Sequence, residues 1–553
     1  MKAIRLNGLR LTLDESEECL AAKAARVLDI TASDILSLAV IRKALDARRS
    51  RPPYFVYAVK ICLADSAVVP ETLSDGLRIL PFLDEPASTG SSDVPRQDEG
   101  VAVTPLSLRG SVATEAISCL SDNKEIATLP AGARNDKEDI AAQSRREWRE
   151  TPGTENLPGG VAGSGPAGLF AAYTLAARGI PVLLLERGRP IEKRVEDVKK
   201  FWEEGVLQPQ SNVLFGEGGA GTFSDGKLTS RTKNPYAALV KKALVEAGAP
   251  RAILTDAKPH IGTDKLRQVI VRMRKKLEAM GCVLQFESQV TDFVIRRGEI
   301  DAVIINGEQE VKTRNVILAI GQSADDTYEK LHERGVKMEP KPFAMGLRVE
   351  HPQALINKIQ YGRWSGHPKL PPAEYFVTAA VKELNRSVYT FCMCPGGQVI
   401  GCSVFPGAVI TNGMSKSKRS GEFANSAVVV NVRVEDFAGS GGPLNGLVFR
   451  NHWEREAFRA GGGNYCAPAQ KMTDFLKNQT SGTLARTSFL PGVRAAELAE
   501  LLPAFVVDAL RKGIRQFDQK MPGFISEEAH LIGVETRTSS PLRLCRGTDG
   551  QSE

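Results

Sequence analysis

The chain has 553 residues, of which 42% are hydrophobic and 25% charged, with a formal net charge of +7. These values are ordinary for a globular protein, and the length predicts two or three domains. The positive charge is spread along the chain without a Lys/Arg block interleaved with aromatic residues, so the composition argues against a nucleic-acid partner.

The sequence also argues against a membrane partner and against export. No uninterrupted apolar stretch reaches the ~18 residues that a membrane span needs. The N-terminal stretch lacks the apolar core of a targeting signal and turns acidic. Nine cysteines are scattered without framework spacing, which is typical of reduced thiols. We therefore expect a cytoplasmic chain.

Residues 1–63 predict a small α+β module. Apolar residues alternate in the segments that resemble strands and follow helical spacing between them. The expected elements are two strands, a helix and two further strands, at Ile4–Leu6, Leu9–Leu13, Ser16–Leu28, Ile35–Arg42 and Tyr54–Leu63. We see no catalytic combination of side chains there and interpret the module as structural or as a docking domain.

Residues 64–157 have a different composition. Ser, Thr, Pro, Gly, Asp and Glu dominate, as in the stretch from Pro86 to Gly100, and only Asp136–Glu150 has helical spacing. Segments of this composition bury too little apolar surface to fold on their own. We expect a long linker or insertion that is disordered in large part.

A G-x-G-x-x-G motif opens the next segment, with the sequence Gly163-Ser164-Gly165-Pro166-Ala167-Gly168. A helical run, Leu169–Arg178, follows it, and then comes a buried strand, Pro181–Leu185, that Glu186 closes. A turn, a helix and a second strand ending in an acid form the order of a dinucleotide-binding β-α-β unit. This order at this spacing is a more specific signal than the glycines alone.

Each part of this unit has a physical role. Gly163 permits the tight turn, Gly165 lets the backbone approach a diphosphate, and Gly168 allows the helix to pack closely on the sheet. The helix N-terminus presents N–H groups and the positive end of its dipole to phosphates. Glu186 is placed where a carboxylate can accept hydrogen bonds from ribose hydroxyls. The preceding residues, 156–162, contain a proline and two glycines, so we expect a short first strand.

A second glycine-rich segment, Gly216–Lys227, follows a helix expected at Ile191–Glu204. It contains small residues, hydroxyl side chains and a lysine in the run Gly218-Gly219-Ala220-Gly221-Thr222-Phe223-Ser224-Asp225-Gly226-Lys227. Backbone of this kind packs closely against a flat or anionic ligand. A flexible loop is the alternative interpretation, but the motif upstream favours ligand contact.

Further helices and strands are expected at Tyr236–Ala247, Thr263–Met280, Val283–Phe286, Gln289–Arg296 and Ala302–Ile305. An apolar strand is expected from Val311 to Gly321, ending in Ala319-Ile320-Gly321. Small residues at the end of such a strand let the backbone approach a bound dinucleotide. These elements complete a domain over residues 158–338.

The remaining chain predicts two further parts. Residues 339–450 are rich in strands and turn signals, which indicates a β-rich substrate domain inserted into the first. Residues 451–553 combine helical segments with a last strand, His530–Leu544, and predict an incomplete return to the first domain. The predicted fold class is α/β: a Rossmann-like domain, an inserted β-rich domain and a small N-terminal α+β module.

These residues resemble the uncharacterised FAD-dependent dehydrogenases of the two-dinucleotide-fold flavoprotein superfamily. The matching segments are GSGPAGLFAA from Gly163, LLERG from Leu184, FGEGGAGTFSDGKL from Phe215, VILAIG from Val316, TNGMS from Thr411, APAQ from Ala467, PAF from Pro503 and GVETRTSSP from Gly533. The resemblance covers roughly residues 1–63 and 160–545. Residues 64–157 have no counterpart of that length.

The resemblance implies a non-covalently bound FAD. Its diphosphate would lie on Gly163–Gly168, its ribose at Glu186, and its adenine beside the strand that contains Val290. The segment Gly216–Lys227 would approach the diphosphate and the flavin, and Ala319–Gly321 would form a second turn facing the cofactor. The residues predicted to bind the cofactor are Gly163, Ser164, Gly165, Pro166, Ala167, Gly168, Glu186, Arg187, Gly218, Gly219, Ala220, Gly221, Thr222, Ser224, Asp225, Lys227, Val290, Ala319 and Gly321.

One departure from the family concerns the C-terminus. Members of the family continue past the T-R-T-S-S-P strand into a second glycine-rich motif, with an acidic residue near the ribityl chain and a helix directed at the flavin ring. This chain ends at Glu553 before such a motif. We therefore expect a C-terminal truncation that weakens the flavin side of the site.

The expected reaction is the transfer of a hydride or an electron pair through the flavin, with a small-molecule substrate that the sequence does not identify. We assign no catalytic residue. No second G-x-G-x-x-G with strand and helix context is present, so a tightly held NAD(P) domain is not expected. NAD(P)H could still dock transiently as an electron donor. No metal site is expected, since no paired C-x-x-C or Cys/His spacing occurs.

Other interpretations stay open. Cys392-Met393-Cys394 is a C-x-C, which in a redox role indicates a flavin-linked thiol oxidoreductase, whereas the simpler interpretation is a strand with two small residues on one face. Arg348 and Arg537 could face substrate carboxylates, although structural salt bridges are the more common role. A truncated scaffold without catalysis and a flavoprotein that modifies transfer RNA are further alternatives, and the latter would need a basic stripe that the sequence lacks.

Overall fold

A computed structural model describes residues 2–48, 51–70, 73, 77–81, 159–229, 234, 236–439, 442–548 and 550–552. Its contacts divide the chain into two compact units. Unit 1 comprises residues 1–107, 251–259 and 360–371, and unit 2 comprises the remainder. Most of the linker expected at 64–157, including the helical spacing at 136–150, lies outside the described residues.

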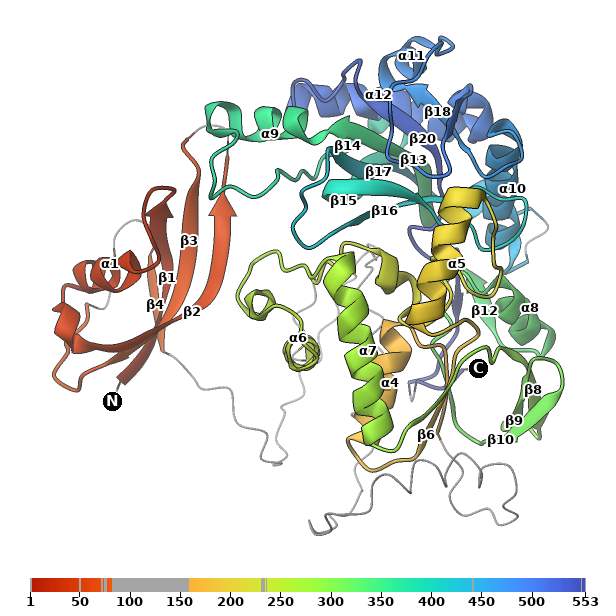
Figure 1. The fold of residues 1–553 in the computed structure, drawn as a ribbon, viewed down its shortest axis with the longest axis horizontal. Helices are drawn as coiled ribbons and strands as arrows, with labels where there is room; N and C mark the ends of the chain where they lie inside the picture. Colours follow the sequence, from red (N-terminus) through yellow and green to blue (C-terminus); the bar gives the residue numbers. More distant parts are fainter. Residues whose placement is uncertain are drawn as a thin grey trace. The chain divides into compact units, whose positions relative to one another are not determined.

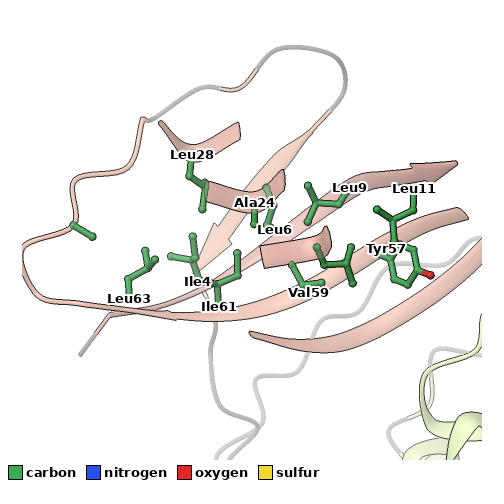
Figure 2. Packing of buried hydrophobic residues seen from close by; sticks show 12 residues of the cluster. Ile4, Leu6, Leu9, Leu11, Ala24, Leu28, Tyr57, Val59, Ile61 and Leu63 are labelled. Carbon is green, nitrogen blue, oxygen red and sulfur yellow. The ribbon is translucent and has the colours of Figure 1, made fainter. Parts of the chain in front are cut away.

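Unit 1 is built on an antiparallel sheet with the strand order β2-β3-β1-β4. Its elements are β1 (Lys2–Thr12), α1 (Cys19–Leu28), β2 (Ile35–Asp46), β3 (Tyr54–Leu63) and β4 (Arg78–Pro81). Helix α1 covers one face of the sheet, its Ala24 and Leu28 belong to the same hydrophobic core as the strands, and Figure 2 shows Ala24 beside Leu6 of β1. The two N-terminal strands expected separately form one strand, because a register shift at Gly8, with φ of 96°, lets pairing continue.

Unit 2 begins with a parallel sheet in the order β11-β5-β6-β7. Its strands are β5 (Gly159–Ala162), β6 (Val182–Leu185), β7 (Val283–Gln285) and β11 (Val316–Leu318). Helix α4 (Pro166–Ala176) connects β5 to β6, and Figure 1 shows it beside α7 (Thr263–Ala279). The β-α-β unit is confirmed, and its first strand has four residues, which is as short as the sequence predicts.

Three more helices belong to this part of the chain: α5 (Ile191–Glu204), α6 (Tyr236–Glu246) and α8 (Asp325–Glu333). The helix expected at Ile191–Glu204 is found with those bounds, and its exposed side is highly charged. Its buried stripe of side chains, spaced three or four residues apart, explains why the pattern predicts it well. The two helices expected after it also agree to within one residue at each end.

An antiparallel sheet with the order β10-β9-β8 follows β7 along the chain. Its strands are β8 (Val290–Arg296), β9 (Glu299–Ile305) and β10 (Gln309–Lys312). The single strand expected from Val311 to Gly321 is wrong, because Val311 belongs to β10 and Val316 begins β11. The polar run between them bends the chain, and the Thr313 hydroxyl donates a hydrogen bond to the Asn315 carbonyl at 3.1 Å.

The second part of unit 2 is a sheet with the order β14-β15-β17-β13-β20-β18-β19, in which β16 pairs with β15. Its strands are β13 (Phe343–Pro352), β14 (Thr378–Val381), β15 (Arg386–Gly401), β16 (Thr411–Ser415), β17 (Phe423–Val432), β18 (Ala467–Lys471), β19 (Val493–Ala495) and β20 (His530–Glu535). Helix α12 (Ala504–Lys520) packs against β14, β15 and β17. Because β18, β19 and β20 come from the tail, the sheet crosses the domain boundary drawn at residue 450.

The remaining elements are α9 (Gln353–Tyr361), α10 (Asn445–Ala460), α11 (Met472–Lys477), β12 (Met338–Pro340) and β21 (Leu542–Leu544). Strand β21 pairs antiparallel with β12, and Leu542 joins the hydrophobic core that contains Leu183 and Leu185 of β6. The tail thus returns to the parallel-sheet region. In the described part of the chain, no helix combines the length and the apolar character that crossing a membrane requires.

Candidate functional site

The turn between β5 and α4 depends on two of its glycines. Gly163 has a φ of 104°, and a Cβ there would overlap the carbonyl group of Ala319. A Cβ on Gly168 would overlap the carbonyl oxygen of Gly163. Both residues therefore serve the fold directly, by allowing the tight turn and the close approach of α4 to the strands.

Gly165 is different, because the protein leaves room at this position. Its φ of −66° suits any residue, and a Cβ would meet only the Gly219 Cα, at 3.9 Å. Gly165 is also the N-cap of α4, where the first N–H groups lack partners within the helix and the dipole has its positive end. An anionic group such as a diphosphate fits this position, where it would use the space that a side chain would take.

The two glycine-rich segments that the sequence singles out meet at this helix end. The Gly218 N–H donates a hydrogen bond to the Ser164 carbonyl at 3.0 Å. A Cβ on Gly219 would lie 2.9 Å from the Gly165 Cα, so the two backbones are in contact. The short helix η2 (Gly219–Phe223) continues from there. The structure therefore brings together residues that lie more than 50 positions apart in the sequence.

The surface formed by these segments consists of small residues. Pro166 and Ala220 are exposed, Gly165 and Gly219 are half-buried, and Ala167 is buried in α4. The third predicted turn adjoins them: Ala319 is half-buried, its N–H donates to the Ala162 carbonyl at 2.8 Å, and Gly321 is exposed with a φ of 73°. A flat or extended ligand can therefore approach the backbone of all three turns.

Glu186 has a role that the sequence does not predict. It is 4% exposed, and its carboxylate accepts hydrogen bonds from four donors. These donors are the Ser164 N–H (2.8 Å) and hydroxyl (2.7 Å), the Gly188 N–H (2.9 Å) and the Gly216 N–H (3.0 Å). Glu186 therefore ties the two glycine-rich segments together. Its predicted contact with a ribose stays a prediction, and a ribose hydroxyl would have to replace one of these donors.

Arg194 is a residue of the site that sequence reasoning missed. It lies on α5, is fully buried, and uses all five N–H donors of its guanidinium. The acceptors are the carbonyls of Asn212 (2.8 Å), Glu217 (2.5 Å), Val213 (2.9 Å) and Gly219 (2.9 Å) and the hydroxyl of Thr222 (3.0 Å). Burial lowers the pKa of Arg194. Its place on the apolar stripe of α5, between Ile191 and Val198, was the signal available in the sequence.

Most of the polar side chains that are predicted to bind the cofactor form hydrogen bonds or ion pairs within the protein instead. Thr222 donates to the Glu217 carbonyl at 2.8 Å, and Ser224 donates to the Gly221 carbonyl at 3.0 Å. Arg187 pairs with Asp326 at 2.9 Å and stacks on the ring of Phe215. The segment Gly216–Lys227 would therefore contact a ligand chiefly through its backbone.

Val290 and Asp225 occupy two different environments. Val290 is the first residue of β8, is 6% exposed and packs in a hydrophobic core together with residues of the parallel sheet. Asp225 is buried and forms ion pairs with Lys227, at 2.9 Å, and with Arg419. The pKa of Asp225 is lowered because these two cations outweigh the effect of burial. The partners of both side chains thus lie elsewhere than the small-residue surface at Gly165.

The arginines considered for substrate carboxylates have carboxylate partners within the chain. Arg348 pairs with Glu535 at 3.2 Å, and Arg537 pairs with Glu454 at 2.8 Å. All four side chains are buried. Their charges are therefore compensated within the protein. This is the structural salt-bridge role that was the alternative to binding substrate carboxylates. In the described ranges, no group of three or more His, Cys, Asp or Glu residues is arranged to hold a metal ion.

Two family descriptions match parts of this chain. Residues 342–538 match FAD-dependent protein, C-terminal domain-like, and residues 3–62 match a domain of unknown function. The chain is also 38% identical over 552 residues to an uncharacterized protein of Clostridium beijerinckii, and the alignment covers 100% of this chain and 92% of that protein. This alignment gives no support to the predicted C-terminal truncation.

Solved structures give weaker similarities. The chain is 15% identical to Thermovibrio ammonificans THI4, with a TM-score of 0.25 over 38% of this chain and 76% of that one. It is 13% identical to Bacillus halodurans glycerol-3-phosphate dehydrogenase complexed with FAD, with a TM-score of 0.27 over 53% of this chain and 50% of that one. Similarities of this size carry no argument about the ligand or the reaction of this chain.

Proposed function

The chain belongs to the same family as the uncharacterized Clostridium beijerinckii protein, and on that premise we propose that it is an FAD-dependent oxidoreductase with a non-covalently bound flavin. The substrate is a small molecule of unidentified class. The proposal includes NAD(P)H as an electron donor that docks transiently.

One observation carries the proposal: Gly165 lies at the N-terminus of α4 with space for a ligand instead of a side chain. The backbone of Gly165 and Gly219 would hold the diphosphate of FAD, and Ala319 and Gly321 would flank the cofactor. FAD supplies two-electron chemistry when it is bound. The chain itself supplies the orientation of that group, through the loops that Glu186 and Arg194 fix.

The substitution Gly165→Ala tests this assignment. The new methyl group fits the protein, since only Gly219 lies within 4 Å, but it occupies the space proposed for the diphosphate. We expect the dissociation constant for FAD to rise at least about tenfold, which corresponds to about 1.4 kcal/mol. The midpoint of thermal unfolding without FAD should fall only by the cost of a poorer N-cap, about 1 kcal/mol, and less than in Gly168→Ala. FAD binding can be followed by flavin absorbance and by titration of the flavin-free protein.

Two other glycines provide controls. Gly482 has no atom within 4 Å of an added Cβ, so Gly482→Ala should change neither FAD affinity nor stability. Gly168→Ala should lower the unfolding midpoint whether or not FAD is added, because the Cβ would overlap the Gly163 carbonyl. Wild-type FAD affinity in Gly165→Ala would contradict the proposed diphosphate position.

The main alternative is a scaffold of this family without catalysis. A purified protein that is colourless and binds no added FAD would favour that alternative over the proposal. A flavin spectrum that bleaches under anaerobic NADPH would support both the flavin and the proposed donor. A flavin spectrum that only dithionite bleaches would support the flavin and remove NADPH as donor.

A further inference from the structure

The C-x-C segment does not form the regular strand that the sequence suggests. Cys392 has a φ of 48°, and the pairing of β15 with β17 shifts register between Phe391 and Cys394. A shift of this kind re-aims side chains relative to the alternation of a regular strand. The Cys394 Sγ lies 3.4 Å from the Cys392 carbonyl oxygen, so the second thiol folds back towards the first cysteine.

Cations surround this pair of thiols. The Lys227 Nζ lies 3.5 Å from the Cys394 Sγ, and the Arg348 Nη2 lies 3.9 Å from it. The same Arg348 nitrogen donates to the Cys392 carbonyl at 2.8 Å. Asp225 pairs with Lys227 and Glu535 pairs with Arg348, so both cations are held in place. Lys227 ends the segment predicted to contact the flavin, although it lies 167 residues before Cys394.

These surroundings differ from those of Cys282. Cys402 is 1% exposed within an apolar cluster but also interacts electrostatically with the Arg537 guanidinium. Burial alone raises the pKa of Cys282 to about 11. The pKa of Cys394 is also raised, first by its hydrogen bond with Cys392 and then by burial, while Lys227 and Arg348 oppose the rise. A packing thiol needs no cationic neighbours, and a thiol that must carry negative charge during a reaction does.

We propose that Cys392 and Cys394 form a thiol–disulfide exchange site that takes disulfide-bonded substrates. Cys392 is half-buried and can be reached, whereas Cys394 is fully buried. The Cys392 sulfur attacks the substrate disulfide, whose S–S bond breaks as a mixed disulfide forms, and the first substrate thiol leaves with the Cys392 proton. Cys394 then attacks the Cys392 sulfur, and the second substrate thiol leaves with the Cys394 proton.

The exchange is balanced within these groups. One substrate disulfide is reduced to two thiols, and the two protein thiols are oxidised to one disulfide, so two electrons pass to the substrate. Cys394 donates a hydrogen bond to the Cys392 carbonyl at 3.4 Å, which keeps its proton until the second step. Lys227 then stabilises the negative charge that develops on Cys394. Lys227 is therefore a positioning residue for Cys394.

The exchange can be tested on the purified full chain without reference to its flavin content. The protein is equilibrated under nitrogen in mixtures of reduced and oxidised glutathione, alkylated, digested and examined by mass spectrometry. We expect a Cys392–Cys394 disulfide to form as the oxidised fraction rises, while Cys282 and Cys402 stay alkylated. A C-x-C peptide that remains fully alkylated in oxidised glutathione would overturn the proposal.

Single substitutions test the order of the two steps. Cys394→Ser should retain one glutathione on Cys392, because no second thiol can release it. Cys392→Ser should form no adduct, since Cys394 is buried. Cys466→Ser, which alters a half-buried cysteine elsewhere, should behave like the wild type. Equal adduct formation in the first two variants would contradict the assigned order.

A charge-removing variant tests the role of Lys227. Lys227→Met should slow closure of the disulfide about tenfold or more while glutathione still adds to Cys392, because a cation within ~4–6 Å favours the thiolate by 1–3 pKa units. Lys227→Arg should recover most of the rate. Equal closure rates in both variants and the wild type would remove Lys227 from the site. If the disulfide forms in a protein that binds no FAD, the thiol–disulfide exchange site is supported and the proposed function fails. If the protein binds FAD and no disulfide forms, the proposed function is supported and the exchange site fails.

Discussion

Replacement of Arg194 by lysine is the most direct test of how the glycine-rich segment is held. The five guanidinium donors bond four carbonyls and one hydroxyl within residues 212–222, and all of these hydrogen bonds are buried except the half-buried one to Gly219. A lysine ammonium has three donors, so at least two acceptors lose their partner. Each buried group left without a partner costs about 1–3 kcal/mol, and the expected loss in the free energy of unfolding is therefore about 2–6 kcal/mol.

The measurement combines urea unfolding with amide hydrogen exchange. Arg194→Lys should lower the urea midpoint and accelerate exchange in peptides that cover residues 212–222 before other regions respond. Arg189→Lys is the control, because Arg189 is partly exposed and its ion pair with the exposed Glu287 contributes about 0–1 kcal/mol. If the two variants have the same urea midpoint and the same exchange pattern, Arg194 does not hold the segment as described.

Two further predictions concern Glu186 and His351. Glu186→Gln replaces one carboxylate oxygen by an NH2 group, and the loss of at least one hydrogen bond to a charged acceptor should cost about 1.5–3 kcal/mol; amide exchange at Ser164, Gly188 and Gly216 should accelerate, and unchanged exchange would argue against the four-donor arrangement. Burial lowers the pKa of His351 to about 4. Because the unfolded chain has a histidine pKa of ~6.5, this residue contributes stability above that pH, and about 3 kcal/mol is lost as the pH falls towards 4. His351→Asn should flatten this part of the stability profile measured by urea unfolding, and an unchanged slope would contradict the assignment.

The sequence predicts the β-α-β unit well because its signals are local. Turn glycines, a helix start and a buried strand follow one another within 30 residues, and each element is set by its own spacing. The helix at Ile191–Glu204 is predicted for the same reason. The strand expected from Val311 to Gly321 fails because apolar content alone does not reveal that a bend separates two strands belonging to different sheets.

Contacts between distant segments account for what the sequence cannot show. Glu186 accepts from Gly216, and Lys227 reaches Cys394 across 167 positions. Neither pairing has a periodic signature, because each depends on how complete elements are placed. The large sheet illustrates the same limit, since β18 has five residues and β19 three, and the fold alone brings β18 between β20 and β19. Strands this short carry little alternation of their own.

The three glycines of the motif also differ in what they can establish. Gly163 and Gly168 would overlap protein atoms if they carried a Cβ, so the fold alone accounts for them. Gly165 would meet only Gly219 at 3.9 Å, so no contact within the protein excludes a side chain there, although glycine is also a favoured N-cap residue. A helix N-terminus with this room next to it leaves space for an object outside the chain. The motif therefore supports a ligand through Gly165, and the same argument makes Gly165→Ala, rather than a substitution at either neighbour, the decisive measurement.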